Sequence, residues 1–374
     1  MKNGIIRNAV VLTSNGFAGT DIKIQNGLIS AFGSFEPDFG ESFDADGLTA
    51  LPGFVDTHLH GAADVEFSSG NEDLDAALEW EASRGVTAIL PTTRSLPFDQ
   101  IEAAVSNITR HMNAPSEAGA PPRARVCGFH AEGPFVNPLK KGAMDPKKIQ
   151  PVDVAFCKRL AEGGALRIMS IAPELDNAGK AAKLLRGHGV SVSMAHTAAD
   201  FDCARKAFHA GFDRMTHTFN AMEPLNHRSP NAVGFALGCD GIVCELICDL
   251  VHVEAGALLT VIKAKTPARV CMVSDSGKFA GLPDGEYTVD GRVRYVSNGR
   301  CTLADGTIAG SCVSLLEGVK NLYALGIPLE DISVMASKNP AEAAGLNAGV
   351  LEPGRLADIV LMDRNLDPVR TFIG

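Results

Sequence analysis

Histidines and carboxylates stand where short apolar runs of this 374-residue chain end. In chain order they are His58, His60, Glu132, His196, His217 and Asp275. His58 and His60 are two residues apart, so both would project from the same side of an extended strand. Neutral imidazoles together with a carboxylate bind divalent cations such as Zn²⁺ or Fe²⁺ at catalytic sites that keep one position open. A single histidine at a strand end is usually structural, but its repetition along the chain indicates a metal site.

Eight apolar runs would have to bring these side chains together. They cover residues 50–56, 87–91, 125–130, 167–172, 190–195, 214–218, 244–248 and 269–274. Most are almost continuously apolar, which is typical of parallel strands covered on both faces. Helical patterns separate several of them, over residues 73–84, 98–110, 178–186 and 199–210. This alternation predicts an α/β fold, a TIM-type (β/α)8 barrel with its chemistry at the carboxyl ends of the strands.

The two ends of the chain have a different pattern. Residues 5–12 and 21–24 resemble short strands separated by an Asn15-Gly16 turn, and residues 355–363 are again strand-like. Each end alone is too short to bury a core. We therefore expect a small β-sandwich domain built from residues 1–50 and 350–374, with the barrel over residues 51–349. A polar insert at 286–306 predicts a hairpin after the eighth strand.

Composition excludes several classes of function. Lys and Arg number 34 against 44 Asp and Glu, and a net charge of −10 argues against a nucleic-acid partner. No window is apolar enough for a membrane span, and the first residues lack the apolar stretch of a signal peptide. The nine cysteines have no paired C-x-x-C spacing. We expect reduced thiols and a cytoplasmic protein without membrane contact.

Several motifs carry a family resemblance. They include ALPGFVDTHLHG, FHAEGPF, MAHT, THTFNAM, CDLVH and VSDSG, with NPAEAAGL and LEPGRLADIVLMD near the end. The H-x-H pair and the last aspartate are similar to the amidohydrolase superfamily as a whole. HAEGPF followed by HTFNAM more narrowly resembles the N-acetylglucosamine-6-phosphate deacetylases, and the likeness runs nearly from end to end.

The resemblance implies a metal centre of defined composition. Glu132, His196 and His217 would hold one divalent ion. His58 and His60, with Glu132 as a bridge and Asp275, would hold a second, so that one or two ions are expected. Zinc is the first candidate for the metal, with iron, cobalt or manganese as the others.

The resemblance also implies a reaction, the hydrolysis of the acetamide of an N-acetylated amino-sugar phosphate. The substrate would be N-acetylglucosamine 6-phosphate or a close epimer such as N-acetylgalactosamine 6-phosphate. A bound divalent metal would activate water and polarise the carbonyl. Asp275 is the expected catalytic residue. It would take a proton from water and return it to the departing amine, because an amide does not break without protonation of its nitrogen.

The phosphate group needs hydrogen-bond donors. In the resembling family, the residues that match Asn220, Ala221, Arg228 and His252 contact the sugar phosphate. The arginine and the residue before it, here His227, reach in from the neighbouring subunit of a dimer. The resemblance therefore implies a homodimer with a shared site.

One position departs from the family pattern. After HAEGPF the family has a histidine that helps to polarise the substrate carbonyl, whereas this chain has Ala143 followed by Met144. A thioether cannot donate a hydrogen bond to a developing oxyanion. The metal alone, another side chain or a different substrate could explain the change. Another amidohydrolase-superfamily hydrolase or deaminase, and a sugar-phosphate sensor that no longer catalyses, are the competing interpretations.

Overall fold

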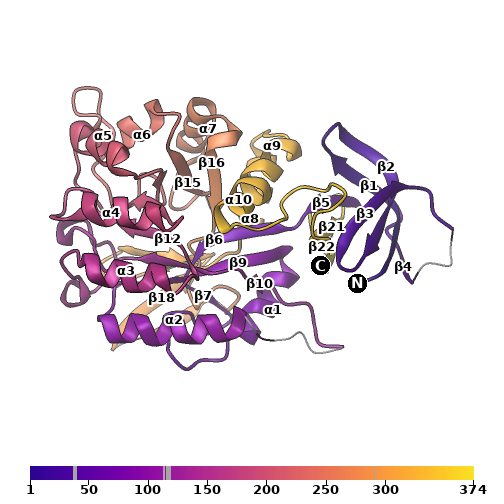
Figure 1. Ribbon diagram of the computed structural model, residues 1–374, viewed down its shortest axis with the longest axis horizontal. Helices are drawn as coiled ribbons and strands as arrows, with labels where there is room; N and C mark the ends of the chain where they lie inside the picture. The colour runs from indigo at the N-terminus through magenta and orange to yellow at the C-terminus, as the bar shows by residue number, and fades with distance from the viewer. Residues whose placement is uncertain (37–39, 113, 115–118, 290) are drawn as a thin grey trace.

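The computed structural model describes residues 1–36, 40–112, 114, 119–289 and 291–374. It consists of a barrel and a small sheet to one side that contains both chain ends (Figure 1). Eight parallel strands form the barrel in the order β6, β9, β11, β12, β13, β14, β15, β16, and β10 (Arg125–Val126) adds to β9. Their bounds are Phe54–Leu59, Val86–Thr93, Phe129–Glu132, Leu166–Ile171, Ser191–Met194, Arg214–Met215, Val243–Ile247 and Val270–Val273. The predicted TIM-type barrel is confirmed.

Hydrogen bonds just beyond the last strand close the barrel. The backbone N–H of Asp275 donates to the carbonyl of His58 at 2.9 Å, and the N–H of His60 donates to the carbonyl of Ser276 at 2.7 Å. The buried carboxylate of Asp56 accepts the N–H of Ser274 at 3.2 Å. Closure therefore places the H-x-H pair of the first strand beside the aspartate that follows the eighth.

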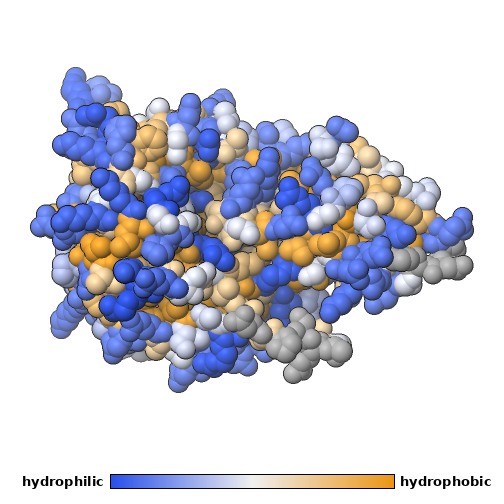
Figure 2. Space-filling view, viewed as in Figure 1, coloured by the Kyte–Doolittle hydropathy of each residue, from blue (hydrophilic) through white to orange (hydrophobic). Residues whose placement is uncertain are grey.

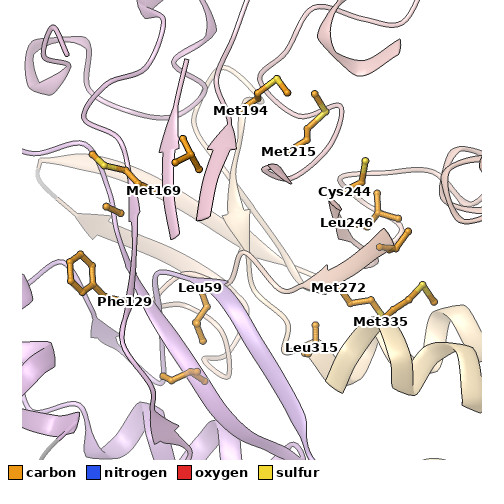
Figure 3. Packing of buried hydrophobic residues seen from close by; sticks show 14 of the residues in the cluster. Leu59, Phe129, Met169, Met194, Met215, Cys244, Leu246, Met272, Leu315 and Met335 are labelled. Carbon is orange, nitrogen blue, oxygen red and sulfur yellow. The ribbon is translucent and has the colours of Figure 1, made fainter. Parts of the chain in front are cut away.

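Helices cover the outside of the barrel (Figure 1). They are α1 (Asp75–Ser83), α2 (Phe98–Met112), α3 (Val154–Glu162), α4 (Ala178–Gly187), α5 (Phe201–Ala210), α6 (Asn231–Gly238), α7 (Ala255–Lys265), α8 (Leu315–Ala324), α9 (Leu329–Ser333) and α10 (Asn339–Ala344). The outward side chains of the strands pack beneath them, among them Met169, Met194, Met215 and Met272 (Figure 3). Apolar burial of this extent is the main force that holds the barrel closed.

Alternation along the strands gives the barrel interior a different composition. Val55, Ala88 and Ile168 form an apolar cluster with Ala341 and Ala344 of α10, which covers that end of the barrel. Polar side chains come next along the strands, and they too are buried. They are His130, Ser170, Ser193, Thr216 and Glu245. The interior therefore changes from apolar to polar toward the carboxyl ends of the strands.

The seven-stranded small sheet takes strands from both ends of the chain. It contains β1 (Gly4–Thr13), β2 (Gly16–Gln25), β3 (Leu28–Gly33), β4 (Glu41–Asp44), β5 (Thr49–Pro52), β21 (Ile359–Met362) and β22 (Pro368–Phe372). β1 pairs with β4 over its first half and with β5 over its second. The expectation of one barrel strand over residues 50–56 is wrong, because this run is divided between β5 of the small sheet and β6 of the barrel. The division into domains at residues 50 and 350 stays a prediction.

An antiparallel sheet follows the eighth barrel strand, where a hairpin was expected over residues 286–306. It has the strands β17 (Gly285–Val289), β18 (Arg292–Ser297), β19 (Arg300–Thr302) and β20 (Ile308–Ser311). Two short strands after β6, β7 (Gly61–Ala62) and β8 (Val65–Glu66), pair with each other. Hydrophilic residues are spread over the face seen in Figure 2. No helix among the described residues combines the length and apolar composition needed to cross a bilayer.

We predict that Glu81→Gln makes stability less dependent on pH. Glu81 of α1 is fully buried, and burial, with the charges of Asp56 and Glu317, raises its pKa well above the ordinary value of 4.5. Above pH 4.5 the unfolded chain therefore loses a proton that the folded protein keeps. As the pH rises further, Glu81 lowers the free energy of unfolding. The difference in unfolding free energy, variant minus wild type, should increase by up to about 1.4 kcal/mol per pH unit. Urea unfolding at pH 6 and pH 8 measures it, and a constant difference would contradict the assignment.

Candidate metal centre and substrate pocket

Glu132 lies at the centre of a cluster of ligand atoms. It is the last residue of β11, while His196 and His217 each follow the end of a strand by two residues. The Glu132 Oε1 atom is 3.1 Å from His196 Nε2 and 2.9 Å from His217 Nε2. All three side chains are buried and close enough to one another to share one cation. The carboxyl ends of three strands thus converge as the sequence predicts.

A second group of ligand atoms adjoins the first through the same carboxylate. His60 Nε2 is 3.2 Å from Glu132 Oε2 and 3.3 Å from Asp275 Oδ1. His58 Nε2 is 3.6 Å from Glu132 Oε1 and 3.6 Å from Asp275 Oδ1. The bridging position of Glu132 is what two neighbouring cations would need.

The backbone is unusual at these strand ends. The φ angles of His196, His217 and Asp275 are 44°, 28° and 49°, in the left-handed region that side chains other than glycine rarely adopt. Each such residue costs on the order of 1–3 kcal/mol, and such residues gather at functional sites. This backbone conformation therefore lowers the stability of the barrel, and in return it directs these three side chains toward one point.

The Nδ1 atoms of two histidines, which point away from the centre, support this arrangement. Nδ1 of His60 lies 3.2 Å from the carbonyl oxygen of Thr92, and Nδ1 of His196 lies 2.8 Å from that of Lys140. A carbonyl only accepts, so each Nδ1 carries a hydrogen, and each Nε2 is the nitrogen that faces the centre and could bind a cation. Nε2 of His58 is buried and forms no hydrogen bond with any described residue. This donor set fits a divalent cation.

The two carboxylates of the centre are held in their ionised form. Burial opposes ionisation of Asp275, but the charge of His58 and the hydrogen bond with His60 outweigh it and lower its pKa. The same balance, with His58 and His196 as the opposing charges, lowers the pKa of Glu132 well below its usual value. Burial disfavours charge on His60, yet Asp275 and Glu132 raise its pKa to about 9. The two carboxylates therefore favour positive charge at the centre. A divalent cation would supply this charge in place of the protons on the histidines.

His130, whose role the sequence leaves open, is a buried neutral side chain beneath the centre. Its Nδ1 lies 3.0 Å from the carbonyl of Thr57 and its Nε2 2.8 Å from the Ser170 hydroxyl. Burial, with the nearby charge of His58, lowers its pKa to about 3. Its ring packs edge-on against that of His58, with 4.6 Å between centroids. His130 therefore supports a proposed ligand and does not itself face the cavity.

A cavity of about 440 Å³ opens onto the centre. Of the expected site residues, its lining contains His60, Glu132, Ala143, Met144, His196, His217, Asn220, Ala221, His252 and Asp275. Its size is in the usual range for a small-molecule site. His227 and Arg228 are exposed on the loop after Ala221 and do not line it. The structure thus brings the expected residues together, apart from His227 and Arg228. His58 belongs to the cluster but does not line the cavity.

Two features of the site are not predicted from the sequence. The sheet after the eighth strand lines the cavity with Arg292, Arg294 and residues 307–310. Glu245, in the middle of β15, is fully buried and lies 3.1 Å from Nδ1 of His58. The available signal was a charged residue inside an otherwise apolar run, because such a residue is rarely buried without a partner.

We predict that zinc stabilises the protein through Glu132. Restoring zinc to chelator-treated protein at 100 times its Kd should raise the unfolding free energy by about 2.7 kcal/mol. Glu132→Ala should abolish this gain, because the carboxylate contacts all four imidazoles. Glu162→Ala, which removes an exposed carboxylate from α3, serves as the control and should keep it. Thermal unfolding with and without zinc provides the measurement, and an unchanged zinc response in Glu132→Ala would refute the assignment.

Comparisons with known proteins agree with this geometry. The Amidohydrolase family matches residues 49–374. The chain is 33% identical to an N-acetylgalactosamine-6-phosphate deacetylase of Escherichia coli O157:H7, over 99% of the chain and 97% of that protein. It is 31% identical to an N-acetylglucosamine-6-phosphate deacetylase of Bacillus subtilis, over 98% of the chain and 95% of that protein.

Solved structures give the same result. A mutant N-acetyl-D-glucosamine-6-phosphate deacetylase from Mycobacterium smegmatis, in complex with N-acetyl-D-glucosamine-6-phosphate, aligns with a TM-score of 0.91 and 28% identity. The alignment covers 100% of this chain and 98% of that one. The deacetylase of Pasteurella multocida aligns with the same TM-score and 26% identity, over 99% and 97% of the two chains. The chain belongs to the N-acetylglucosamine-6-phosphate deacetylase family of the amidohydrolase superfamily.

Proposed function

We propose that this protein is a metal-dependent deacetylase of N-acetylated hexosamine 6-phosphates. The product pair would be acetate and glucosamine 6-phosphate, or the galactosamine epimer. The observation that carries the proposal is the convergence of Glu132, His196, His217 and Asp275 on one cavity. The relatives support the substrate class, because their names specify N-acetylated hexosamine 6-phosphates and one structure contains such a sugar.

Glu132, His196 and His217 would hold the first divalent ion, and His58, His60, Glu132 and Asp275 the second. A bound ion lowers the pKa of water and polarises the amide carbonyl. Zinc fits the imidazole and carboxylate donors, and iron, cobalt or manganese share this preference in part. The proposal is supported by the buried Nε2 of His58, which needs a partner.

Asp275 is proposed to move the proton. Its carboxylate lines the cavity and is ionised, with a pKa below the usual range, so that it can accept a proton from the attacking water. The protonated carboxyl group can then give the same proton to the leaving nitrogen. One side chain thus serves both steps, because acceptance precedes donation.

The phosphate is proposed to lie at the side of the cavity that contains Asn220, Ala221 and His252. Asp249 holds the His252 ring, with its Oδ2 atom 2.7 Å from Nδ1 and its charge raising the pKa of the ring against the effect of burial. A protonated His252 would attract a phosphate dianion. Positive residues also line the cavity, in contrast to the net charge of the chain. They are Arg94, Lys148, Lys278, Arg292 and Arg294.

We infer a homodimer in which His227 and Arg228 of one subunit complete the other subunit's phosphate site. Their exposure on a loop away from their own cavity supports this inference. We also infer a cytoplasmic location, since the nine cysteines are all free thiols.

Replacing Met144 with His should raise turnover of N-acetylglucosamine 6-phosphate. The Met144 sulfur lines the cavity and accepts a hydrogen bond from the Ser95 hydroxyl at 3.0 Å, so that it offers no donor to an oxyanion. A histidine donor could contribute at most about 10²–10³-fold. Met144→Leu, which changes only the thioether, is the control and should show no gain. Steady-state kcat tests this, and no gain for Met144→His would mean that the substrate carbonyl is not near this loop or that the pocket rejects this sugar.

Asp275→Asn should lower kcat by about 10²–10⁴-fold, because it removes the proton carrier and leaves the shape of the side chain unchanged. The rate should be measured with metal content matched to wild type, so that loss of ions is not mistaken for loss of proton transfer. A variant that retains wild-type turnover would contradict the role of Asp275.

The substrate class is tested with a panel of N-acyl hexosamines, with and without the 6-phosphate, against enzyme of known metal content. Release of acetate from the phosphorylated sugars only, in either epimer, is the expected result. Activity on unphosphorylated amides would favour another hydrolase of the superfamily, and binding without turnover would favour a sensor.

A further inference from the structure

Glu245 is a carboxylate in the interior of the barrel, away from the cavity. It lies in the middle of β15 with an exposed fraction of 0%, and it is absent from the cavity lining. Burial of a carboxylate is costly unless it is paired. Its Oε2 atom is 3.1 Å from Nδ1 of His58, and its Oε1 atom is 3.6 Å from the guanidinium of Arg214, which is also buried.

The contact with Glu245 determines which nitrogen of His58 carries the hydrogen. An ionised carboxylate only accepts hydrogen bonds, so Nδ1 of His58 is the donor. Nε2 is then the nitrogen that faces Glu132 and Asp275, each 3.6 Å away, and it is the one available to a cation. Arg214 places a fixed positive charge 3.6 Å from Oε1 of Glu245 and so holds the carboxylate beside His58.

The His58 ring is also fixed in orientation. The ring of His130 packs against it, and both nitrogens of His130 are occupied by Thr57 and Ser170. His60 and His196 have backbone carbonyls at the position where His58 has Glu245. A carboxylate polarises the imidazole more strongly than a neutral carbonyl and makes it a better ligand.

We propose that Glu245, held by Arg214, is a positioning residue that sets the affinity of the second metal site through His58. This inference rests on the two-ion centre in the proposed function, but not on the identity of the sugar. Glu245 does not line the cavity, so its effect on the metal site must pass through the ring of His58. The first ion, held by Glu132, His196 and His217, should be unaffected.

The test compares Glu245→Gln with Glu81→Gln, which makes the same chemical change at another fully buried carboxylate. Zinc retained per chain is measured by elemental analysis after dialysis against a series of chelator concentrations. Wild type and Glu81→Gln should release the second equivalent at the same chelator concentration. Glu245→Gln should release it with about 10–100-fold weaker affinity and hold the first equivalent as wild type does.

A double variant separates positioning from a general structural effect. In His58→Asn protein the second equivalent is already weakened, and adding Glu245→Gln should then change zinc retention no further. The proposal is overturned if wild type holds only one equivalent, if Glu245→Gln retains both as wild type does, or if Glu245→Gln weakens both equally. Absence of deacetylation with the expected zinc pattern would refute the proposed function and leave the role of Glu245 in place.

Discussion

The Glu132 carboxylate holds the whole cluster of histidines together at the mouth of the barrel. Its two oxygens lie within 3.6 Å of the Nε2 atoms of four histidines, which come from three other strand ends. Four imidazoles gathered here, three of them buried, would be costly to desolvate without a shared counter-charge. The closed barrel is what allows one carboxylate to serve all four, because each strand end points toward the same axis. A cation is the natural partner of such a cluster, and the family to which the chain belongs uses one.

The interior of the barrel prepares this site in stages. Side chains near α10 are apolar and supply burial energy, whereas His130, Ser170 and Thr216 are polar and hydrogen-bond with one another. Low dielectric strengthens such hydrogen bonds and penalises any group left out of them. Hydrogen-bonded polar side chains therefore lie directly beneath the proposed ligands. The left-handed backbone at His196, His217 and Asp275 can be tolerated because the surrounding structure holds these residues in place.

Much of this arrangement could be predicted from the sequence, for physical reasons. Continuous apolar runs identify strands buried on both faces, and a barrel brings their carboxyl ends together. The sequence therefore predicts that Glu132, His196 and His217 lie close to one another, and in the structure they do. The prediction of one barrel strand over residues 50–56 was wrong, because nothing in the apolar composition of this run shows that Gly53 separates two sheets. The part of Glu245 depends on contact with His58 across 187 positions, and no local pattern reports such a contact. Arg228 is exposed and does not line the cavity, so no contact within the single chain bears on the role predicted for it.

The proposed function depends above all on the binding of one divalent cation where Glu132, His196 and His217 meet. Anomalous X-ray diffraction at the zinc absorption edge, from crystals of the zinc-loaded protein, tests it most directly. We expect a strong anomalous peak about 2.0–2.2 Å from an oxygen of Glu132 and from the Nε2 atoms of both histidines. A peak bound elsewhere, with these three side chains still in mutual contact and no density between them, would contradict it.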